Sequence, residues 1–294
     1  MELFINQLIN GLNTGSIYAL VAVGYTMVYG IIRLINFAHG EIMMFGAYFA
    51  FLFAFTLPFE LPFIIVILLA MILAAVMGML IERIAYKRLR KAPRISALIT
   101  AIGMSLFLQN LALLIFGPNP KVMDSLISTE PVVIFGFNVA RLTVYTIVLS
   151  IVFMIVLTLF VKRTKPGKAM RAVSMDKEAA MLMGINVNSI ISLTFAIGSA
   201  LGALGGVFYA MAYVQIFPTL GVMPGLKAFI AAVLGGIGNI TGAMLGGYLI
   251  GIIETMVKAY VSSKWVDGIV FGLLIVILLF KPSGILGKNV REKV

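Results

Sequence analysis

Apolar stretches long enough to cross a lipid bilayer recur along the whole sequence, separated by short loops. A helix needs about 20 apolar residues to span the hydrocarbon core, because only a helix satisfies its own backbone hydrogen bonds there. Candidate spans lie at about 8–32, 37–57, 61–82, 95–116, 143–161, 189–213, 224–238, 240–260 and 266–281. The span at 224–238 is short enough to be re-entrant, so we expect about 8–10 crossings.

The composition excludes a soluble enzyme and a secreted domain. Of 294 residues, 62% are hydrophobic and 11% are charged, whereas a soluble domain carries roughly a quarter charged residues. With no cysteine and one histidine, the chain lacks the residues for a disulfide or a multi-histidine metal site. We therefore predict an all-α polytopic transmembrane bundle, a single domain over residues 1–294 that is not an enzyme and has no catalytic residue or metal.

Lysine and arginine gather in segments between the apolar stretches. Of 22 such residues, six lie in 83–94, six in 162–177 and four in 281–293. Short loops rich in Lys and Arg face the cytoplasm, so we expect these segments, including the C-terminus, inside the cell and the N-terminus outside. Because the basic residues do not share one solvated face, the net charge of +11 does not indicate nucleic-acid binding.

The loop at 162–188 has an amphipathic pattern. Pro166 and Gly167 interrupt the preceding span, and we expect one short helix from Lys168 that ends at Gly184 in a left-handed turn. Its apolar residues are Met170, Val173, Ala180, Met181 and Met183, and its polar residues are Lys168, Arg171, Asp176, Lys177 and Glu178. Such a helix between two spans is typical of an element that docks into a groove of a partner protein. The alternative is a helix that lies on lipid headgroups.

Small residues recur at helical spacing in the second half of the chain. Examples are Gly202 and Gly206, then Gly238, Gly242 and Gly246. In lipid there is no hydrophobic drive between helices, so small residues favour association by letting backbones approach closely. We expect these glycines to be helix contacts within the bundle, and contact with a partner subunit is the alternative.

Few ionisable groups fall inside the spans. Lys227 is one of them, and Glu254 and Lys258 are four residues apart, which favours an ion pair on one helix face. A polar group between the first two spans comprises Arg33, Asn36, His39 and Glu41. A proton relay would need more such groups across the bilayer. We interpret this group as a polar hinge at the cytoplasmic interface.

Several motifs resemble one family of membrane proteins. Glu178-Ala179-Ala180, followed after three residues by Gly184, matches the E-A-A-x-x-x-G opening of the signature of ABC importer permeases, although the I-x-L-P continuation is absent. Further matching blocks are Tyr25–Ile32, Ile35–Glu41, Ser96–Ser105, Ala231–Gly238 and Pro282–Gly287. Together they resemble the Liv-type branched-chain amino acid permeases, H-type, of the binding-protein-dependent importers.

The resemblance implies a function and a set of partners. The chain would be the permease subunit of an ATP-driven importer in the inner membrane of a prokaryote, working with a paralogous permease, two cytoplasmic ATPases and an extracytoplasmic binding protein. ATP and Mg would be bound by the ATPases, with no cofactor in this chain. Contacts to the ATPase would come from Lys168, Arg171, Asp176, Glu178, Ala179, Ala180 and Gly184. Asn36, His39 and Glu41 would either lie near the cytoplasmic side of the translocation route or support the helix that contacts the ATPase.

Two other functions remain open at this point. Permeases for urea or short-chain amides share much of this sequence pattern. A stand-alone secondary transporter or channel would need several carboxylates in the membrane or a ring of selectivity groups, and the spans carry few charges.

Overall fold

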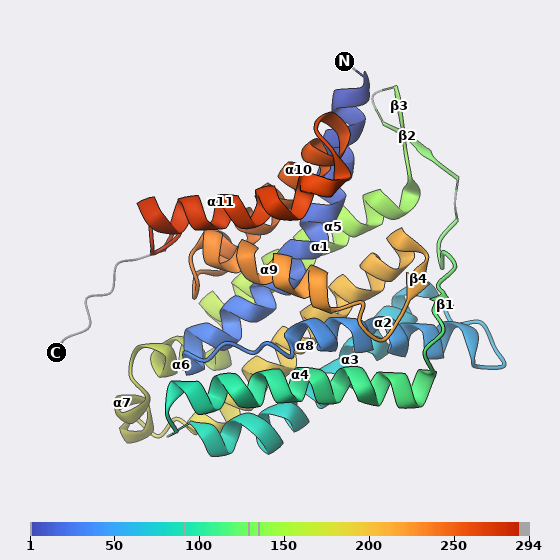
Figure 1. Cartoon of the computed structure of the whole chain (residues 1–294). Coiled ribbons are helices and arrows are strands. Elements are labelled where there is room, and N and C mark those ends of the chain that lie inside the picture. The colour runs from blue at the N-terminus through green and yellow to red at the C-terminus, as the bar shows by residue number, and fades with distance from the viewer. Residues whose placement is uncertain (1, 91, 129, 135, 288–294) are drawn as a thin grey trace.

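The computed structural model describes residues 2–90, 92–128, 130–134 and 136–287. In this part of the chain it is a bundle of helices with a few short strands at one end (Figure 1). The helices are α1 (Glu2–Ile32), α2 (His39–Phe55), α3 (Phe63–Ile81), α4 (Arg94–Phe116), α5 (Arg141–Arg163), α6 (Lys165–Met175), α7 (Lys177–Leu182), α8 (Val187–Tyr213), α9 (Val222–Gly235), α10 (Ile240–Tyr260) and α11 (Val266–Phe280). This architecture confirms the all-α polytopic class.

Each of the expected spans corresponds to a helix. In the described residues, 7 helices are long and apolar enough to cross a membrane. The other two, α2 and α9, are apolar but have only 17 and 14 residues. The segment that begins the first basic loop is also helical, because α3 continues as a π-turn (Glu82–Tyr86) and a 3-10 turn (Lys87–Leu89).

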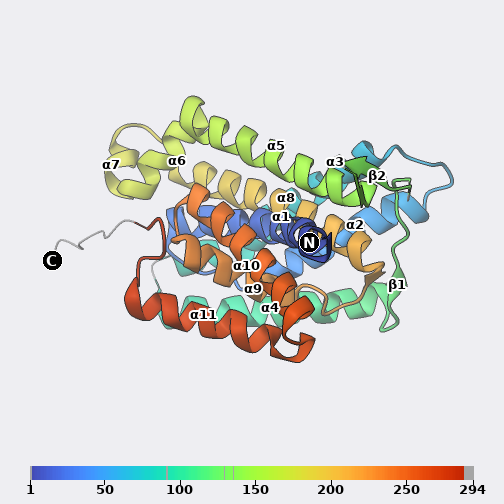
Figure 2. The same ribbon diagram turned by 90° about the horizontal axis from the view of Figure 1, so that it is seen from above.

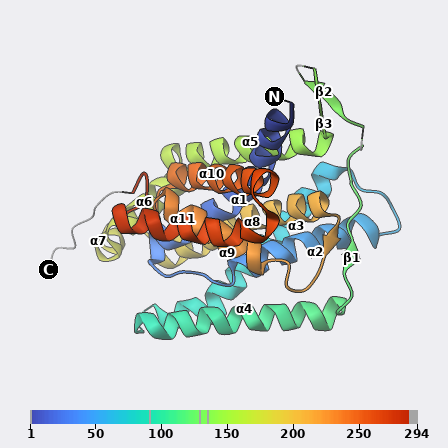
Figure 3. The same cartoon turned by 45° about the horizontal axis from the view of Figure 1, so that its top comes forward.

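The two ends of the bundle differ in structure. At one end β1 (Lys121–Val122) pairs antiparallel with β4 (Gln215–Ile216), and β2 (Val132–Ile134) forms a hairpin with β3 (Phe137–Val139). The first residues of α1 lie toward this end, and α6 and α7 lie at the opposite end (Figures 1 and 3). The described part of the C-terminal segment lies near α6, whereas the basic residues of 288–294 fall outside the described residues.

Helices α1 and α8 form the centre of the bundle, and α4 and α11 lie at its edge. The apolar parts of α1 and α8 are mostly buried, whereas those of α4 and α11 are mostly exposed. Figure 2 shows α11 along one edge of the bundle, and Figure 3 shows α4 separated from most of the other helices. In lipid, an exposed apolar helix face is stable without a protein neighbour.

Glycines allow close contacts between helices at several of the expected positions. A Cβ on Gly206 of α8 would lie 2.8 Å from the carbonyl carbon of Met43, and one on Gly246 of α10 would lie 2.9 Å from that of Ala231. Gly242 likewise faces Gly235 of α9. Gly238 differs, because it lies in the turn between α9 and α10 with a φ of +91°. It adopts a positive-φ turn conformation that favours glycine, and it still lies against α1, since a Cβ on Gly30 would be 3.4 Å from the Gly238 Cα.

Candidate functional site

Two helices begin in the middle of the bundle rather than at its surface. His39, the first residue of α2, lies against Gly24 of α1 and against Gly202, which is near the middle of the 27-residue helix α8. The first turn of α9 meets α2 at the same depth, since a Cβ on Gly225 would lie 2.7 Å from the Cα of Gly40. The N-termini of two short helices therefore meet inside the bundle.

Asn36, His39 and Glu41 are all buried in the bundle. Their exposed fractions are 2%, 1% and 3%, and their role as a hinge at the cytoplasmic interface stays a prediction. The chain after α1 folds back into the bundle because Asn36 Oδ1 accepts hydrogen bonds from the Tyr86 hydroxyl, at 2.8 Å, and from the backbone N–H of Ala38, at 3.1 Å. Arg33 does not join them: its side chain is exposed.

Glu41 lacks a full set of partners. Its Oε1 accepts a hydrogen bond from Gln109 Nε2 of α4 at 2.8 Å. Its Oε2 is buried and accepts no hydrogen bond from a described residue. None of the ion pairs between described residues includes Glu41. A buried carboxylate oxygen without a donor is costly, which marks this position as a candidate site for a polar ligand.

A second polar cluster joins four helices. Glu254 Oε1 of α10 lies 2.6 Å from Lys258 Nζ and 3.1 Å from Lys227 Nζ of α9, and its Oε2 accepts a hydrogen bond from the Tyr18 hydroxyl at 2.8 Å. Lys227 Nζ also lies 2.9 Å from Asp267 Oδ1 of α11. The expected Glu254–Lys258 pair is thus part of a larger network. Its other members are distant in sequence and could not be inferred from spacing.

The loop between α5 and α8 contains two helices, where the sequence suggests one. Asp176 Oδ1 accepts hydrogen bonds from the backbone N–H groups of Glu178, at 2.9 Å, and Ala179, at 3.0 Å. It is therefore the N-cap of α7, and its extended backbone conformation separates α7 from α6. Thr164 caps α6 in the same way, accepting a hydrogen bond from the Gly167 N–H at 3.1 Å, so Pro166 and Gly167 lie in the first turn of α6.

The end of α7 has a defined turn. Gly184 has a φ of +79°, its N–H donates to the Met181 carbonyl, and the Ile185 N–H donates to the Ala180 carbonyl. This hydrogen-bond pattern is the Schellman motif, in which glycine supplies the left-handed residue. The loop is therefore an ordered structure fixed at both ends by local hydrogen bonds.

The apolar residues of this loop fall into two groups. Met170, Val173 and Ala180 are buried against the bundle, as an amphipathic helix predicts. Met181 and Met183, also apolar residues of the amphipathic pattern, are exposed. With Met175 and Leu182 they form an exposed apolar surface, here called the α7 patch, whose members are 55% to 89% exposed. The break at Asp176 turns α7 away from the axis of α6 and so exposes these side chains.

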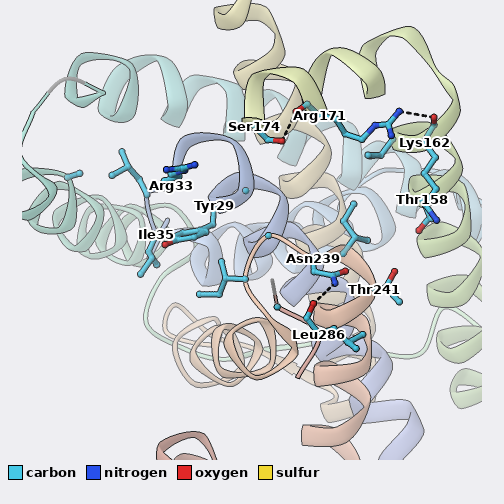
Figure 4. A pocket seen from close by; sticks show the side chains of 18 of the residues that line it. Tyr29, Arg33, Ile35, Thr158, Lys162, Arg171, Ser174, Asn239, Thr241 and Leu286 are labelled. Atoms are coloured by element: carbon cyan, nitrogen blue, oxygen red, sulfur yellow. Dashed lines mark hydrogen bonds between the residues drawn. The ribbon is translucent and has the colours of Figure 1, made fainter. Parts of the chain in front are cut away.

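A basic cavity lies next to this loop. It has a volume of about 990 Å³ and is lined by residues that include Arg33, Lys162 and Arg171 (Figure 4). Arg171 Nη2 donates to the carbonyl of Lys162 at 3.2 Å. Nearby, burial and the charges of Arg90 and Arg33 lower the pKa of Lys177. The positive charges around α6 and α7 favour an anionic or acidic group of a partner.

A bundle of this kind, with short helices that begin at its centre and an ordered loop beyond its end, defines a multi-pass membrane transport protein. In the described residues, no group of three or more His, Asp or Glu side chains is arranged to hold a metal ion.

Comparison with known proteins gives the family. The family described as the permease component of branched-chain amino acid transport systems matches residues 7–279. The chain is 44% identical to the high-affinity branched-chain amino acid transport system permease protein LivH of Escherichia coli (strain K12), over 99% of this chain and 98% of that protein. It is 44% identical to BraD of Pseudomonas aeruginosa, a permease protein of the same description, over the same shares. The chain belongs to this permease family.

One further relative is a permease of a different name. The chain is 30% identical to the probable branched-chain amino acid transport permease protein LivM of Methanocaldococcus jannaschii, over 54% of this chain and 51% of that protein.

Proposed function

We propose that this chain is the membrane-spanning permease subunit of an ATP-driven importer for leucine, isoleucine and valine. An extracytoplasmic binding protein delivers the amino acid, and cytoplasmic ATPases bind and hydrolyse ATP with Mg. The observation that carries the proposal is the 44% identity to LivH along 99% of the chain. The relatives named above are permease proteins, which supports a non-catalytic role for this chain.

The segment between α5 and α8, which contains α6 and α7 and is here called the α6–α7 loop, is the proposed contact with the ATPase. The α7 patch and the exposed side chains of Lys168, Arg171 and Glu178 offer a mixed apolar and charged surface to a partner. Asp176, Ala180 and Gly184 give this surface its shape through the cap, the buried contact and the final turn. Movement of the ATPase would pass to α8 through the short connection at 183–186.

The orientation and the second permease follow the same reasoning. The positive charges of α6 and α7 favour the cytoplasm for this end of the bundle. On this proposal the first residues of α1 lie on the outer side of the inner membrane. The similarity to a LivM permease supports a paralogous partner. The exposed faces of α3, α4, α5 and α11 are among the surfaces available to that partner or to lipid.

Transport by a reconstituted complex tests the proposal. The chain is purified with the subunits that co-purify with it and placed in liposomes so that α7 faces the lumen. Binding protein is added outside the liposomes, and ATP is enclosed in the lumen. We expect ATP-dependent accumulation of labelled leucine, isoleucine and valine, and none of urea. Accumulation of urea instead, or uptake by the chain alone along an ion gradient, would replace this proposal by one of the alternatives.

The role of the loop is tested by reversing one charge. Glu178→Lys should leave the complex assembled but reduce the stimulation of ATP hydrolysis by liganded binding protein, because Glu178 is exposed on α7. Glu60→Lys, the same change at an exposed position in the loop between α2 and α3, is the matched control. Equal stimulation in both variants would remove Glu178 from the contact.

A further inference from the structure

We propose that the cavity between α1, α2, α4 and α9 holds the amino acid during transport. Glu41 would pair with its ammonium group, and the first turn of α9 would face its carboxylate. This inference rests on the function proposed above and assigns residues to it. The cavity has a volume of about 180 Å³, below the roughly 300 Å³ at which pockets for drug-sized ligands begin, so it suits a small molecule.

Glu41 gives the cavity its negative pole. It lines the cavity, is 97% buried, and has one carboxylate oxygen without a hydrogen-bond donor from a described residue. A carboxylate inside a membrane is normally paired with a cation or a hydrogen-bond donor. An ammonium group has three donors and a positive charge, so it satisfies this oxygen better than any neutral ligand group.

The first turn of α9 gives the cavity its positive pole. Gly221, Val222 and Gly225 line the cavity, and α9 has no side-chain cap and no acidic residue in its first turn. The Val222 and Gly225 N–H groups donate to the carbonyls of Thr219 and Gly221, and Pro224 has no N–H. What α9 offers an anion here is therefore the positive end of its helix dipole. The first turn of α2 differs, because Glu41 itself lies in it and compensates the dipole. The site therefore has one negative and one positive pole, the charge pattern of a zwitterion.

The remaining walls are apolar. Leu106 of α4 and the aromatic rings of Tyr25 and Phe229 line the cavity, with 5.8 Å between the centres of the two rings. Ser105 and Gln109 are the polar side chains that α4 contributes. An aliphatic side chain of a ligand would be buried against these groups, at about 25 cal/mol for each Å² removed from water. This lining favours leucine, isoleucine or valine over a polar amino acid.

The position of the cavity also fits a transport intermediate. Ser105 and Gln109 lie near the middle of the 23-residue helix α4, and Gly40 is beside the centre of the bundle. Substrate sites at the midplane, built from the ends of discontinuous helices, allow access to alternate between the two sides.

Direct binding tests the site without transport. The purified complex, in detergent and without binding protein, is titrated with radiolabelled leucine. We expect saturable binding that unlabelled isoleucine displaces. 4-Methylpentanoate, which lacks the ammonium group, and 3-methylbutylamine, which lacks the carboxylate, should fail to displace leucine at 100-fold excess. Displacement by either analogue at the same concentration as isoleucine would contradict the two-pole arrangement.

Variants assign the poles to residues. Glu41→Gln should weaken leucine binding about tenfold or more, the loss typical of a charged hydrogen bond. Glu60→Gln, the same change at an exposed loop position, should bind as the wild type does. Ser105→Phe should also abolish binding, because the larger side chain would fill the cavity. Since α4 is loosely packed against the bundle, we expect this variant to assemble, and it tests the site if Glu41→Gln does not assemble.

The outcomes separate this inference from the proposed function. A wild-type complex that transports leucine but binds none, or a Glu41→Gln or Ser105→Phe complex that binds leucine normally, overturns the site and leaves the importer function standing. A wild-type complex that transports none of the three amino acids overturns the function itself.

Discussion

Lys227 of α9 and Glu254 of α10 form an ion pair inside the bundle, with 3.1 Å between Nζ and Oε1. Their side chains are 9% and 2% exposed. The pair ties the short helix α9 to a full-length span, and Asp267 extends it to α11. The pair therefore helps to fix the position of α9 against its neighbours.

We expect Glu254→Leu to be strongly destabilising, because it removes the buried partner of Lys227 and leaves it only the half-exposed carboxylate of Asp267. Removing one member of a buried pair typically costs about 3–5 kcal/mol. The double variant Lys227→Met/Glu254→Leu should recover part of that loss, since no buried charge remains unpaired. The unfolding temperature of the purified complex in detergent measures the loss in Glu254→Leu and its recovery in the double variant. A double variant less stable than Glu254→Leu alone would contradict the charge explanation.

The positions of the helices along the sequence were predictable, whereas the level within the bundle at which each helix begins was not. An apolar stretch of about 20 residues almost dictates a spanning helix, and the helices observed at 94–116 and 240–260 nearly coincide with the expected spans. Hydropathy says nothing of depth, so the start of α2 at the centre of the bundle was missed. That start depends on the contact of His39 with Gly24 and Gly202, which are close only in the folded chain.

The candidate sites were predictable to different degrees. The left-handed turn at Gly184 and the Glu254–Lys258 pair follow from local spacing, and both are present. The break at Asp176 was missed because an Asp inside an amphipathic pattern can be either a polar face residue or an N-cap. The pairing of Glu41 with Gln109 joins residues 68 positions apart, and nothing in either local sequence indicates it.

Gly206→Ala should destabilise the bundle. Its Cβ would lie 2.8 Å from the carbonyl carbon of Met43, and overpacking of this kind typically costs about 1–3 kcal/mol. Gly103→Ala, on α4, is the matched control, because a Cβ at Gly103 would have no neighbouring atom within 4 Å. We expect a lower unfolding temperature for Gly206→Ala and no decrease for Gly103→Ala. Equal temperatures would show that α2 and α8 can separate without cost.

Asp176→Ala should loosen α7. It removes the side-chain acceptor for the N–H groups of Glu178 and Ala179, a loss of about 1 kcal/mol for a typical N-cap. Hydrogen exchange at 177–184 should accelerate, and Asp176→Asn, which keeps an acceptor oxygen, should restore most of the protection. If α7 is the ATPase contact, stimulated ATP hydrolysis should fall in Asp176→Ala and recover in Asp176→Asn. Unchanged exchange in Asp176→Ala would mean that partners or packing, and not the cap, hold α7.

Lys177 should make the stability of the protein depend on pH in the alkaline range. Burial and the nearby charges of Arg90 and Arg33 lower the pKa of its ammonium group from 10.5. Below the lowered pKa the folded and unfolded chains both hold the proton, so the penalty for the buried charge is constant.

As the pH rises from that lowered pKa towards 10.5, the folded chain has released the proton while the unfolded chain still binds it. Stability therefore increases with pH in this window. Lys177→Met should remove that contribution and raise the unfolding temperature at neutral pH, where the wild type carries the penalty in full. Lys165→Met, at an exposed position of α6, should keep the wild-type profile. The measurement is the unfolding temperature of each complex from neutral pH to 10.5, and parallel profiles for Lys177→Met and the wild type would contradict the assignment.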